Sequence, residues 1–211
     1  VRINHTRQEI NGYLCGIQYH MFESQEQKTA EEISCFAVSF HFWGAHLFLN
    51  LNYGEVRNQS LPLNILGREW NQLFERFFEV KSTRERIGLI EEILLNRLNT
   101  MKLNHNLFNS IQHMLLHPGN HSIKTICDSA TTSQRQMERL YQQYIGLSLK
   151  RVSNLVRYQN VWHEIVSSHC YDIHDMVHRY GYTDQAHLLK EFKRFHGVTM
   201  TKSREIAYNS R

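Results

Sequence analysis

The sequence predicts an α+β fold, in which a small β-then-α domain (residues 1–102) precedes an all-α domain (residues 103–211). Apolar residues alternate with a period of two near the beginning of the chain, which is typical of strands. Further along they recur every three or four positions, which is typical of helices. In residues 121–211 a short helix, a turn and a second helix occur twice, so this region is predicted to be a duplicated helix-turn-helix.

Two segments are predicted to be strands. Residues 13–22 place apolar or small side chains at the odd positions from Tyr13 to Met21. In residues 35–43 the apolar side chains of one face are those of Phe36, Val38, Phe40 and Phe42. The polar stretch between the two segments is expected to be a connection.

Helices are predicted from Pro62 onward. The first has an apolar stripe formed by Leu66, Trp70, Leu73, Phe77 and Phe78. Ser82 and Glu85 are spaced as a capping box, in which the serine hydroxyl accepts a hydrogen bond from the Glu85 amide. The helix that they begin has four apolar positions, Ile87, Ile90, Leu94 and Leu98. Another amphipathic helix is predicted over residues 104–116 and ends before Pro118.

The first helix-turn-helix copy is predicted near residues 123–146. Its first helix is short and ends near Ala130, and residues 131–132 make the turn. Ser133 is expected to cap the second helix, with Gln136 at capping-box spacing. The buried stripe of that helix is expected to comprise Met137, Leu140, Tyr141 and Tyr144.

The second copy is predicted near residues 173–197. Gly181 makes the turn, because glycine adopts a positive φ without steric cost. Thr183 is expected to cap the following helix, and Asp184 suits the positive end of the helix dipole. The stripe Leu188, Phe192 and Phe195 is expected to be buried, and Gly197 ends the helix.

One long helix is predicted between the two copies. Residues 149–166 contain neither glycine nor proline, and a helix of that length spans roughly 27 Å at ~1.5 Å per residue. Successive major grooves lie ~34 Å apart along one face of B-DNA. The spacing therefore favours two helices that enter successive grooves of one duplex.

Charge is distributed unevenly along the chain. Residues 121–211 carry 13 Lys and Arg against 8 Asp and Glu, a net charge of +5, whereas residues 1–120 have a net charge of −1. A basic half favours a polyanionic partner, and the alternative is a solvated basic surface.

Composition limits the class of protein. A hydrophobic content of 41% and a charged content of 21% are typical of a globular protein. No run approaches the ~18 apolar residues of a membrane span. Val1 opens a polar stretch, so we expect no signal peptide and a first domain that is truncated at its start. The four cysteines form no C-x-x-C pair, which argues against a zinc site or a disulfide framework and predicts a cytoplasmic protein.

Residues 104–208 resemble the AraC/XylS family of bacterial transcription regulators. The second copy, GYTDQAHLLKEFKRFHGVT at residues 181–199, fits the family pattern G-[FY]-x-D-x-S-H-F-x-R-x-F-K-x-x-x-G-x-[ST]-P. It departs from that pattern at Ala186 and Leu188, where the family usually has Ser and Phe. The first copy matches the equivalent stretch from Ser133 to Ser148 and continues with Lys150 and Arg157. The segment from FAVSFHFWGAHLF to RIGLIEEILLNRL more weakly resembles the cupin-like sensor segment that precedes some of these domains.

The resemblance implies that one helix of each copy lies in the major groove. The expected DNA-binding residues are Ser133, Gln134, Arg135, Glu138 and Arg139 in the first copy and Thr183, Gln185, His187, Lys190 and Arg194 in the second. The residues expected to contact phosphates are Lys150, Arg151, Lys193 and Lys202. The side-chain chemistry is suitable, because Arg can bind guanine and Gln adenine through two hydrogen bonds, and Glu can accept one from cytosine.

Three of these residues have structural alternatives. Instead of contacting DNA, Arg139 could form an ion pair with Asp128 or Glu138. His187 could instead form a hydrogen bond that fixes the turn. Lys193 could instead be a solvated surface residue.

Catalytic and metal sites are not expected. His20, His41 and His46 are the candidate metal ligands, but lone histidines on strands are usually surface residues. Cys15 and Cys35 are expected to be core or surface residues rather than redox sensors. Because no Ser/His/Asp set, Gly-rich phosphate loop or pair of catalytic carboxylates stands out, we expect no cofactor and no enzyme activity.

These observations predict a sequence-specific transcriptional regulator that binds double-stranded DNA. Residues 1–102 are expected to sense an effector or to mediate dimerisation. The further expected partners are RNA polymerase, a small-molecule effector or a protein partner, and a second copy of the chain. One alternative is a small-molecule-binding or enzymatic N-terminal domain that is merely targeted to DNA. Another is a protein-interaction platform built from the amphipathic helices.

Overall fold

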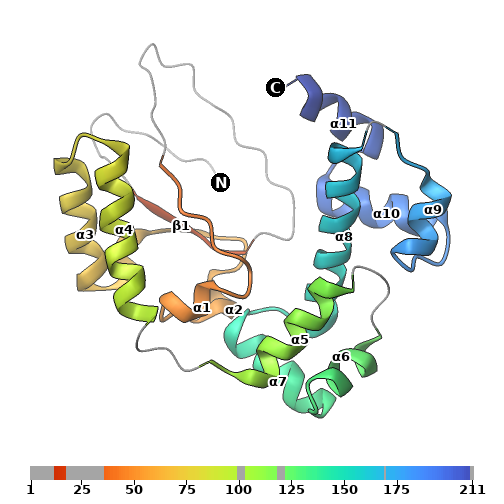
Figure 1. Ribbon diagram of the computed structural model, residues 1–211, viewed down its shortest axis with the longest axis horizontal. Coiled ribbons are helices and arrows are strands. Elements are labelled where there is room, and N and C mark those ends of the chain that lie inside the picture. The colour runs from red at the N-terminus through yellow and green to blue at the C-terminus, as the bar shows by residue number, and fades with distance from the viewer. Residues whose placement is uncertain (1–11, 18–35, 99–102, 118–121, 169, 210–211) are drawn as a thin grey trace. The chain divides into compact units, whose positions relative to one another are not determined.

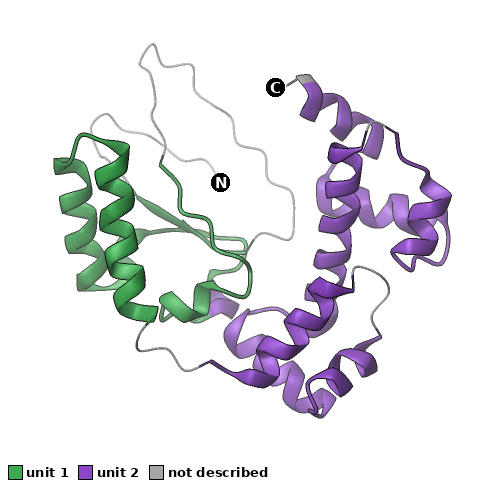
Figure 2. Ribbon diagram, in the orientation of Figure 1, with its two compact units in different colours: residues 1–17, 22–52, 56–102 green, residues 18–21, 53–55, 103–211 purple. Residues whose placement is uncertain are grey.

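The computed structural model describes residues 12–17, 36–98, 103–117, 122–168 and 170–209. The chain divides into two compact units (Figure 2). Unit 1 comprises residues 1–17, 22–52 and 56–102, and unit 2 comprises residues 18–21, 53–55 and 103–211. The predicted α+β class, with a small sheet followed by a helical region, is confirmed.

Unit 1 contains a two-stranded antiparallel sheet. Strand β1 (Tyr13–Cys15) pairs with β2 (Ser60–Pro62), and Leu14 lies opposite Leu61. The short helices α1 (Ala45–Phe48) and α2 (Tyr53–Val56) lie between the strands in sequence. A 3₁₀ turn, η1 (Leu63–Leu66), leads into the longer helices α3 (Arg68–Glu79) and α4 (Thr83–Leu98). The strand β2 was not predicted from the sequence.

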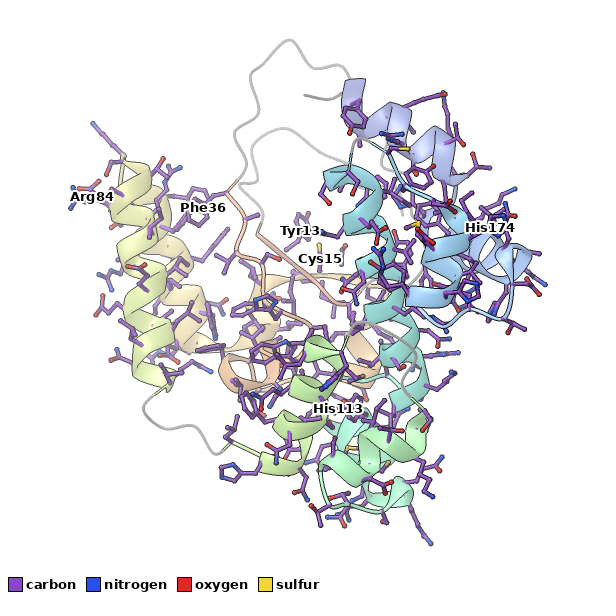
Figure 3. The ribbon with its side chains drawn as sticks, turned by 45° about the vertical axis from the view of Figure 1, so that its right-hand side comes forward. Tyr13, Cys15, Phe36, Arg84, His113 and His174 are labelled. Atoms are coloured by element: carbon purple, nitrogen blue, oxygen red, sulfur yellow. The ribbon has the colours of Figure 1, made fainter. Side chains whose placement is uncertain are left out.

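The strand predicted over residues 35–43 is absent from its described part, residues 36–43. Phe36 and Phe40 make ring contacts with Phe77 and Phe48, at centroid distances of 4.9 and 5.6 Å, whereas Val38 is 43% exposed. Figure 3 shows Phe36 beside the helix pair of this unit. Phe36 and Phe40 therefore anchor the segment to α3 and α1 through ring contacts, without strand pairing. The predicted strand 13–22 forms only over Tyr13–Cys15 in its described residues.

The core of unit 1 is formed by Leu49, Trp70, Leu73 and Ile93. The predicted capping box is confirmed, because the Glu85 amide donates to the Ser82 hydroxyl at 3.2 Å and the Ser82 amide donates to the Glu85 carboxylate at 3.1 Å. Of the four apolar positions noted on α4, Ile87 and Leu98 are 44% and 45% exposed. Ile93, which lies between the predicted positions Ile90 and Leu94, is the side chain that is buried.

Unit 2 is helical in its described residues and is arranged around α8 (Leu149–Ser167) (Figure 1). The preceding helices are α5 (His105–Leu116), α6 (Ile123–Ser129) and α7 (Gln134–Tyr144). The following helices are α9 (Ile173–Arg179), α10 (Gln185–His196) and α11 (Met200–Asn209). Both α7 and α10 pack against α8, so the predicted connecting helix supports both copies.

Two different contacts hold the two groups of helices together. In the first group the hydroxyls of Ser110 on α5 and Tyr141 on α7 are 2.9 Å apart, and both are buried. In the second group Val161 and Ile165 of α8 belong to one core cluster with Leu188 and Phe192 of α10.

None of the helices in the described part of the chain is both long and apolar enough to cross a membrane.

Candidate nucleic-acid interface

The first helix-turn-helix copy turns at a threonine. After α6, Thr131 has a φ of 50°, in the left-handed region that β-branched residues rarely adopt. Ser133 caps α7, because its hydroxyl accepts from the Gln136 amide at 3.3 Å. The predicted cap is confirmed.

The second copy has a turn that is one residue longer. Gly181 follows α9 with a φ of 64°, and α10 begins after Asp184. The Asp184 carboxylate caps the helix, since it accepts from the His187 amide at 2.7 Å. The prediction that Thr183 is the cap is therefore wrong. It placed Thr183 opposite Ser133, although the extra turn residue moves the cap to Asp184.

The two second helices end alike, which aligns them residue by residue. Gly146 follows the end of α7 with a φ of 79°, and Gly197 follows α10 with a φ of 82°. Each residue of α7 therefore corresponds to the residue 51 positions later in α10. Arg135 corresponds to Ala186, and Arg139 corresponds to Lys190.

The outward face of α7 carries guanidinium groups. Met137, Leu140 and Tyr141 are buried, and Gln134, Arg135 and Arg139 are exposed. Among the described residues Arg139 has no ion pair with Asp128 or Glu138, so its predicted structural alternative is not found. Two arginines one helical turn apart thus point away from the core on the same face.

Glu138 lies at the edge of that face and is only partly exposed. Its carboxylate accepts a hydrogen bond from the amide of Leu149 at 3.1 Å. Leu149 is the first residue of α8, where the backbone amides have no partner within the helix. One carboxylate oxygen of Glu138 thus binds the beginning of the connecting helix, and the predicted contact of Glu138 with DNA stays a prediction.

The outward face of α10 differs in composition. Leu188, Glu191 and Phe192 are buried. The exposed residues are Gln185, Ala186, His187, Leu189, Lys190, Lys193 and Arg194. Ala186 and Leu189 were not among the predicted site residues, although they lie on the same outward face as Lys190 and Lys193. Their positions relative to the buried residues on the helix could have predicted that they face outward.

His187 contacts the turn. The Thr183 amide donates to His187 Nδ1 at 3.5 Å, and the ring meets the edge of Tyr182 at a centroid distance of 5.3 Å. These contacts are those of the predicted structural alternative for His187. Its ring nitrogen is therefore engaged in fixing the entry to α10.

Comparison with known proteins agrees with this geometry. A family model described as "Helix-turn-helix domain" matches residues 126–206, which include both turns and α7, α8 and α10. Residues 126–206 form an AraC-type helix-turn-helix domain. The chain is accordingly a DNA-binding transcriptional regulator.

The crystal structure of a transcriptional regulator from Chromobacterium violaceum, described as one of the AraC-type DNA-binding domain-containing proteins, is similar to part of the chain. It is 18% identical, with a TM-score of 0.45, and the match covers 48% of this chain and 91% of that one. No curated protein matches the chain.

A buried ion pair holds α10, the second helix of the second copy, against α8. Arg157 of α8 and Glu191 of α10 form two hydrogen bonds, at 2.6 and 3.1 Å, and their side chains are 9% and 5% exposed. The guanidinium also lies over the ring of Tyr182 at 4.2 Å. Arg194 contacts the other oxygen of Glu191 at 3.4 Å. The sequence predicted a family match at Arg157 but not this pairing.

Tyrosines around the second copy are held in the protonated form. Burial raises the pKa of Tyr180 to about 12, and its hydroxyl donates to Glu164 at 2.6 Å. Burial also raises the pKa of Tyr182. Both phenols therefore stay protonated above the pH at which an exposed tyrosine ionises.

The residues expected to contact phosphates are all exposed. Lys150 and Arg151 lie in the first turn of α8, and Lys193 lies on the outward face of α10. Lys202 of α11 is also exposed, although its ammonium group is 3.4 Å from the Glu205 carboxylate. These four basic groups thus lie on three helices, α8, α10 and α11.

The candidate metal ligands are not gathered into a site. Within the described residues no group of three or more His, Cys, Asp or Glu side chains is arranged to hold a metal ion. His41 stacks on Trp43 at a centroid distance of 5.3 Å, and burial lowers the pKa of His46. Cys15 is exposed, and His20 and Cys35 lie outside the described residues.

Proposed function

We propose that this regulator reads two successive major grooves of one DNA duplex, with α7 in the first and α10 in the second. The supporting observation is that both helices follow a helix-turn-helix turn and expose hydrogen-bond donors opposite a buried stripe. Both helices pack on α8, whose 19 residues span about 28 Å at ~1.5 Å per residue. That length is close to the ~34 Å between successive grooves.

In the first groove, Arg135 and Arg139 contact the bases. A guanidinium that approaches guanine in the major groove donates to both O6 and N7, and such a pair discriminates between bases by about 1–3 kcal/mol. Gln134 and Ser133 lie at the helix entry, where they approach the DNA backbone. We leave Glu138 out of the reading set because its carboxylate already accepts from Leu149.

In the second groove Gln185 is suited to adenine, because its side-chain amide both donates and accepts. Lys190 and Arg194 supply positive charge beside it, and Thr183 lies at the helix entry. The ring of His187 serves the turn and not the bases. Phosphate contacts fall to the exposed side chains of Lys150, Arg151, Lys193 and Lys202.

Selection of bound sequences from random duplex DNA tests this proposal. At about 150 mM salt, binding that depends on phosphates alone is weakened, so sequence preference becomes visible. The full chain should recover two short motifs about one helical turn apart. Arg135→Ala should blur one motif and Gln185→Ala the other.

Arg84→Ala is the matched control for the selection. Arg84 is an exposed arginine in the first turn of α4, and Figure 3 shows it at the end of that helix. Its loss should leave both motifs intact. Recovery of a single motif that depends on Arg135 alone would contradict reading by two helices.

We also propose that unit 1 pairs with a second copy of the chain through α4. Ile87, Leu95 and Leu98 share one face of this helix and are 44%, 58% and 45% exposed. Gly88 lies beside them, and a methyl group added there would meet no atom within 4 Å. Such an exposed glycine in a helix costs stability, which a close approach of a partner helix offsets.

Analytical ultracentrifugation tests the pairing. Leu95→Lys should shift the full chain toward monomer, whereas Leu116→Lys should not, although Leu116 on α5 is 67% exposed. A wild-type chain that is monomeric at all measured concentrations would refute the pairing. Effector sensing by residues 1–102 and a contact with RNA polymerase stay predictions.

A further inference from the structure

Two apolar side chains occupy the outward face of α10. Leu189 is 37% exposed, and Ala186, one turn earlier, is also exposed. Residues three positions apart on a helix are neighbours, so the two side chains form one small apolar surface. We call Ala186 and Leu189 the apolar pair.

Basic and amide groups surround the apolar pair. Gln185 precedes it, and Lys190 and Lys193 share its face of the helix. Arg194 lies to one side, where its guanidinium is 4.8 Å from the ring centroid of Phe195. A partner that fits this face must therefore offer anionic groups around a small apolar group.

The first copy has no such pair at the corresponding positions. Arg135 corresponds to Ala186, and Glu138 corresponds to Leu189. Glu138 is turned to the amide of Leu149, whereas Leu189 extends outward. The two copies therefore present different chemistry at the positions that face a groove.

Duplex DNA offers such a surface at thymine. Phosphates line the major groove, and the C5 methyl group of thymine is the apolar group on its floor. Ala186 is short enough to let a base edge approach, and Leu189 is long enough to reach a methyl group. We infer that the apolar pair selects thymine methyl groups in the half-site bound by α10. This inference rests on the proposed entry of α10 into the major groove.

Removal of the methyl group from the DNA tests the inference directly. The half-sites recovered in the selection supply the probe, and their thymines are replaced one at a time by deoxyuridine, which lacks only the C5 methyl group. The full chain should bind about fourfold more weakly at one or two positions of the α10 half-site, as expected for the loss of one buried carbon group. Cytosine and 5-methylcytosine compared at those positions should show tighter binding of the methylated base.

Leu189→Ala should abolish this discrimination, so that thymine and deoxyuridine bind within about 1.5-fold of each other. Leu116→Ala is the matched control, because this exposed leucine of α5 lies outside α7 and α10, and it should keep the wild-type response. Thermal unfolding of both variants verifies that each remains folded. The cytosine comparison uses the wild-type chain, so it holds even if a variant does not fold.

The outcomes separate the two proposals. If no half-site depends on Gln185, the entry of α10 into the groove fails, and the inference fails with it. If the half-site is recovered but tolerates deoxyuridine at every position, the inference alone is overturned. If Leu189→Ala keeps the full response to the methyl group, a different residue reads it and the inference is also overturned.

Discussion

The two helix-turn-helix copies have the same backbone plan, but different chemistry holds their second helices, with α7 bonded to α5 and α10 paired with α8. In the first, Tyr141 is buried and hydrogen-bonded to Ser110 by neutral hydroxyls. In the second, Glu191 is buried and paired with the charged Arg157. The residue of the first copy that corresponds to Glu191 is Leu140, which is 5% exposed. A duplicated fold thus keeps its geometry while its anchoring contacts diverge.

The outward faces diverge as well. Glu138 joins α7 to the beginning of α8, and Arg135 and Arg139 beside it are exposed. At the corresponding position Leu189 makes the second face partly apolar. The first copy is therefore suited to hydrogen-bonded base edges, and the second to a mixture of methyl groups and phosphates.

The largest expected effect concerns the anchors. Glu191→Ala leaves the buried guanidinium of Arg157 without its main partner, which should lower the free energy of unfolding by about 3–5 kcal/mol. Tyr141→Phe removes one neutral hydrogen bond and should cost only about 1 kcal/mol, since Ser110 still donates to the Leu107 carbonyl. Urea unfolding followed by circular dichroism measures both.

A double variant serves as the control for this comparison. Arg157→Met combined with Glu191→Leu removes both charges, so the pair should be much closer to wild type than Glu191→Ala alone. Equal costs for Glu191→Ala and Tyr141→Phe would mean that the charged anchor is no stronger than the neutral one.

The next effect concerns corresponding cations on the two recognition helices. Arg139→Lys removes a guanidinium that can bind guanine through two hydrogen bonds, so it should weaken binding by about 1–3 kcal/mol and broaden the preference at one base. Lys190→Arg at the corresponding position keeps the charge and should not weaken binding. Fluorescence anisotropy with the selected duplex measures both, and similar losses for the two variants would contradict different roles for these cations.

The turns provide a smaller test. Thr131 has a φ of 50°, where a threonine is strained, and Gly181 has a φ of 64° in the other turn. Thr131→Gly should therefore raise the free energy of unfolding by up to about 1 kcal/mol, and Gly181→Thr should lower it by about as much. Thermal unfolding measures the stability of both variants. A loss of stability in Thr131→Gly would show that the threonine is not strained.

The sequence predicted local features of unit 2 well because they depend on near neighbours. The Ser133 cap, the positive φ of Gly181, the helix end at Gly197 and the long helix after Ser148 follow from residues within one or two turns. The site was predicted less completely. The pairing of Arg157 with Glu191 joins residues 34 positions apart, and no local pattern announces it.

Unit 1 was predicted less well for a related reason. The alternation in residues 36–43 satisfied the strand pattern, but strand formation also needs a partner, and β1 pairs with residues 60–62 instead. On α4, the spacing of apolar residues indicated a helix but not which of its faces is buried, because that face depends on where α1 and α3 lie. At the second turn, one inserted residue moved the cap from Thr183 to Asp184.

The smallest expected effect is an acid sensitivity confined to the second copy. His196 is the last residue of α10, and its counterpart after α7 is Ile145. The His196 ring packs on Trp162 and Phe192, at centroid distances of 4.4 and 4.9 Å, and its Nδ1 is 2.7 Å from the Tyr158 hydroxyl. Burial lowers the pKa of His196 below its ordinary value of 6.5, so the folded state favours the neutral ring.

The sign of the pH dependence follows from that shift. Between the lowered pKa of the folded state and 6.5, the unfolded chain binds more protons at this site than the folded chain. The stability that the neutral ring contributes is complete above about pH 6.5 and is lost as the pH falls through this window. His196→Ile makes the second copy resemble the first, so urea midpoints at pH 7.5 and 5.5 should lie closer together than in the wild type. An unchanged gap would assign the acid sensitivity to other groups, such as His46 of unit 1, whose pKa is also lowered by burial.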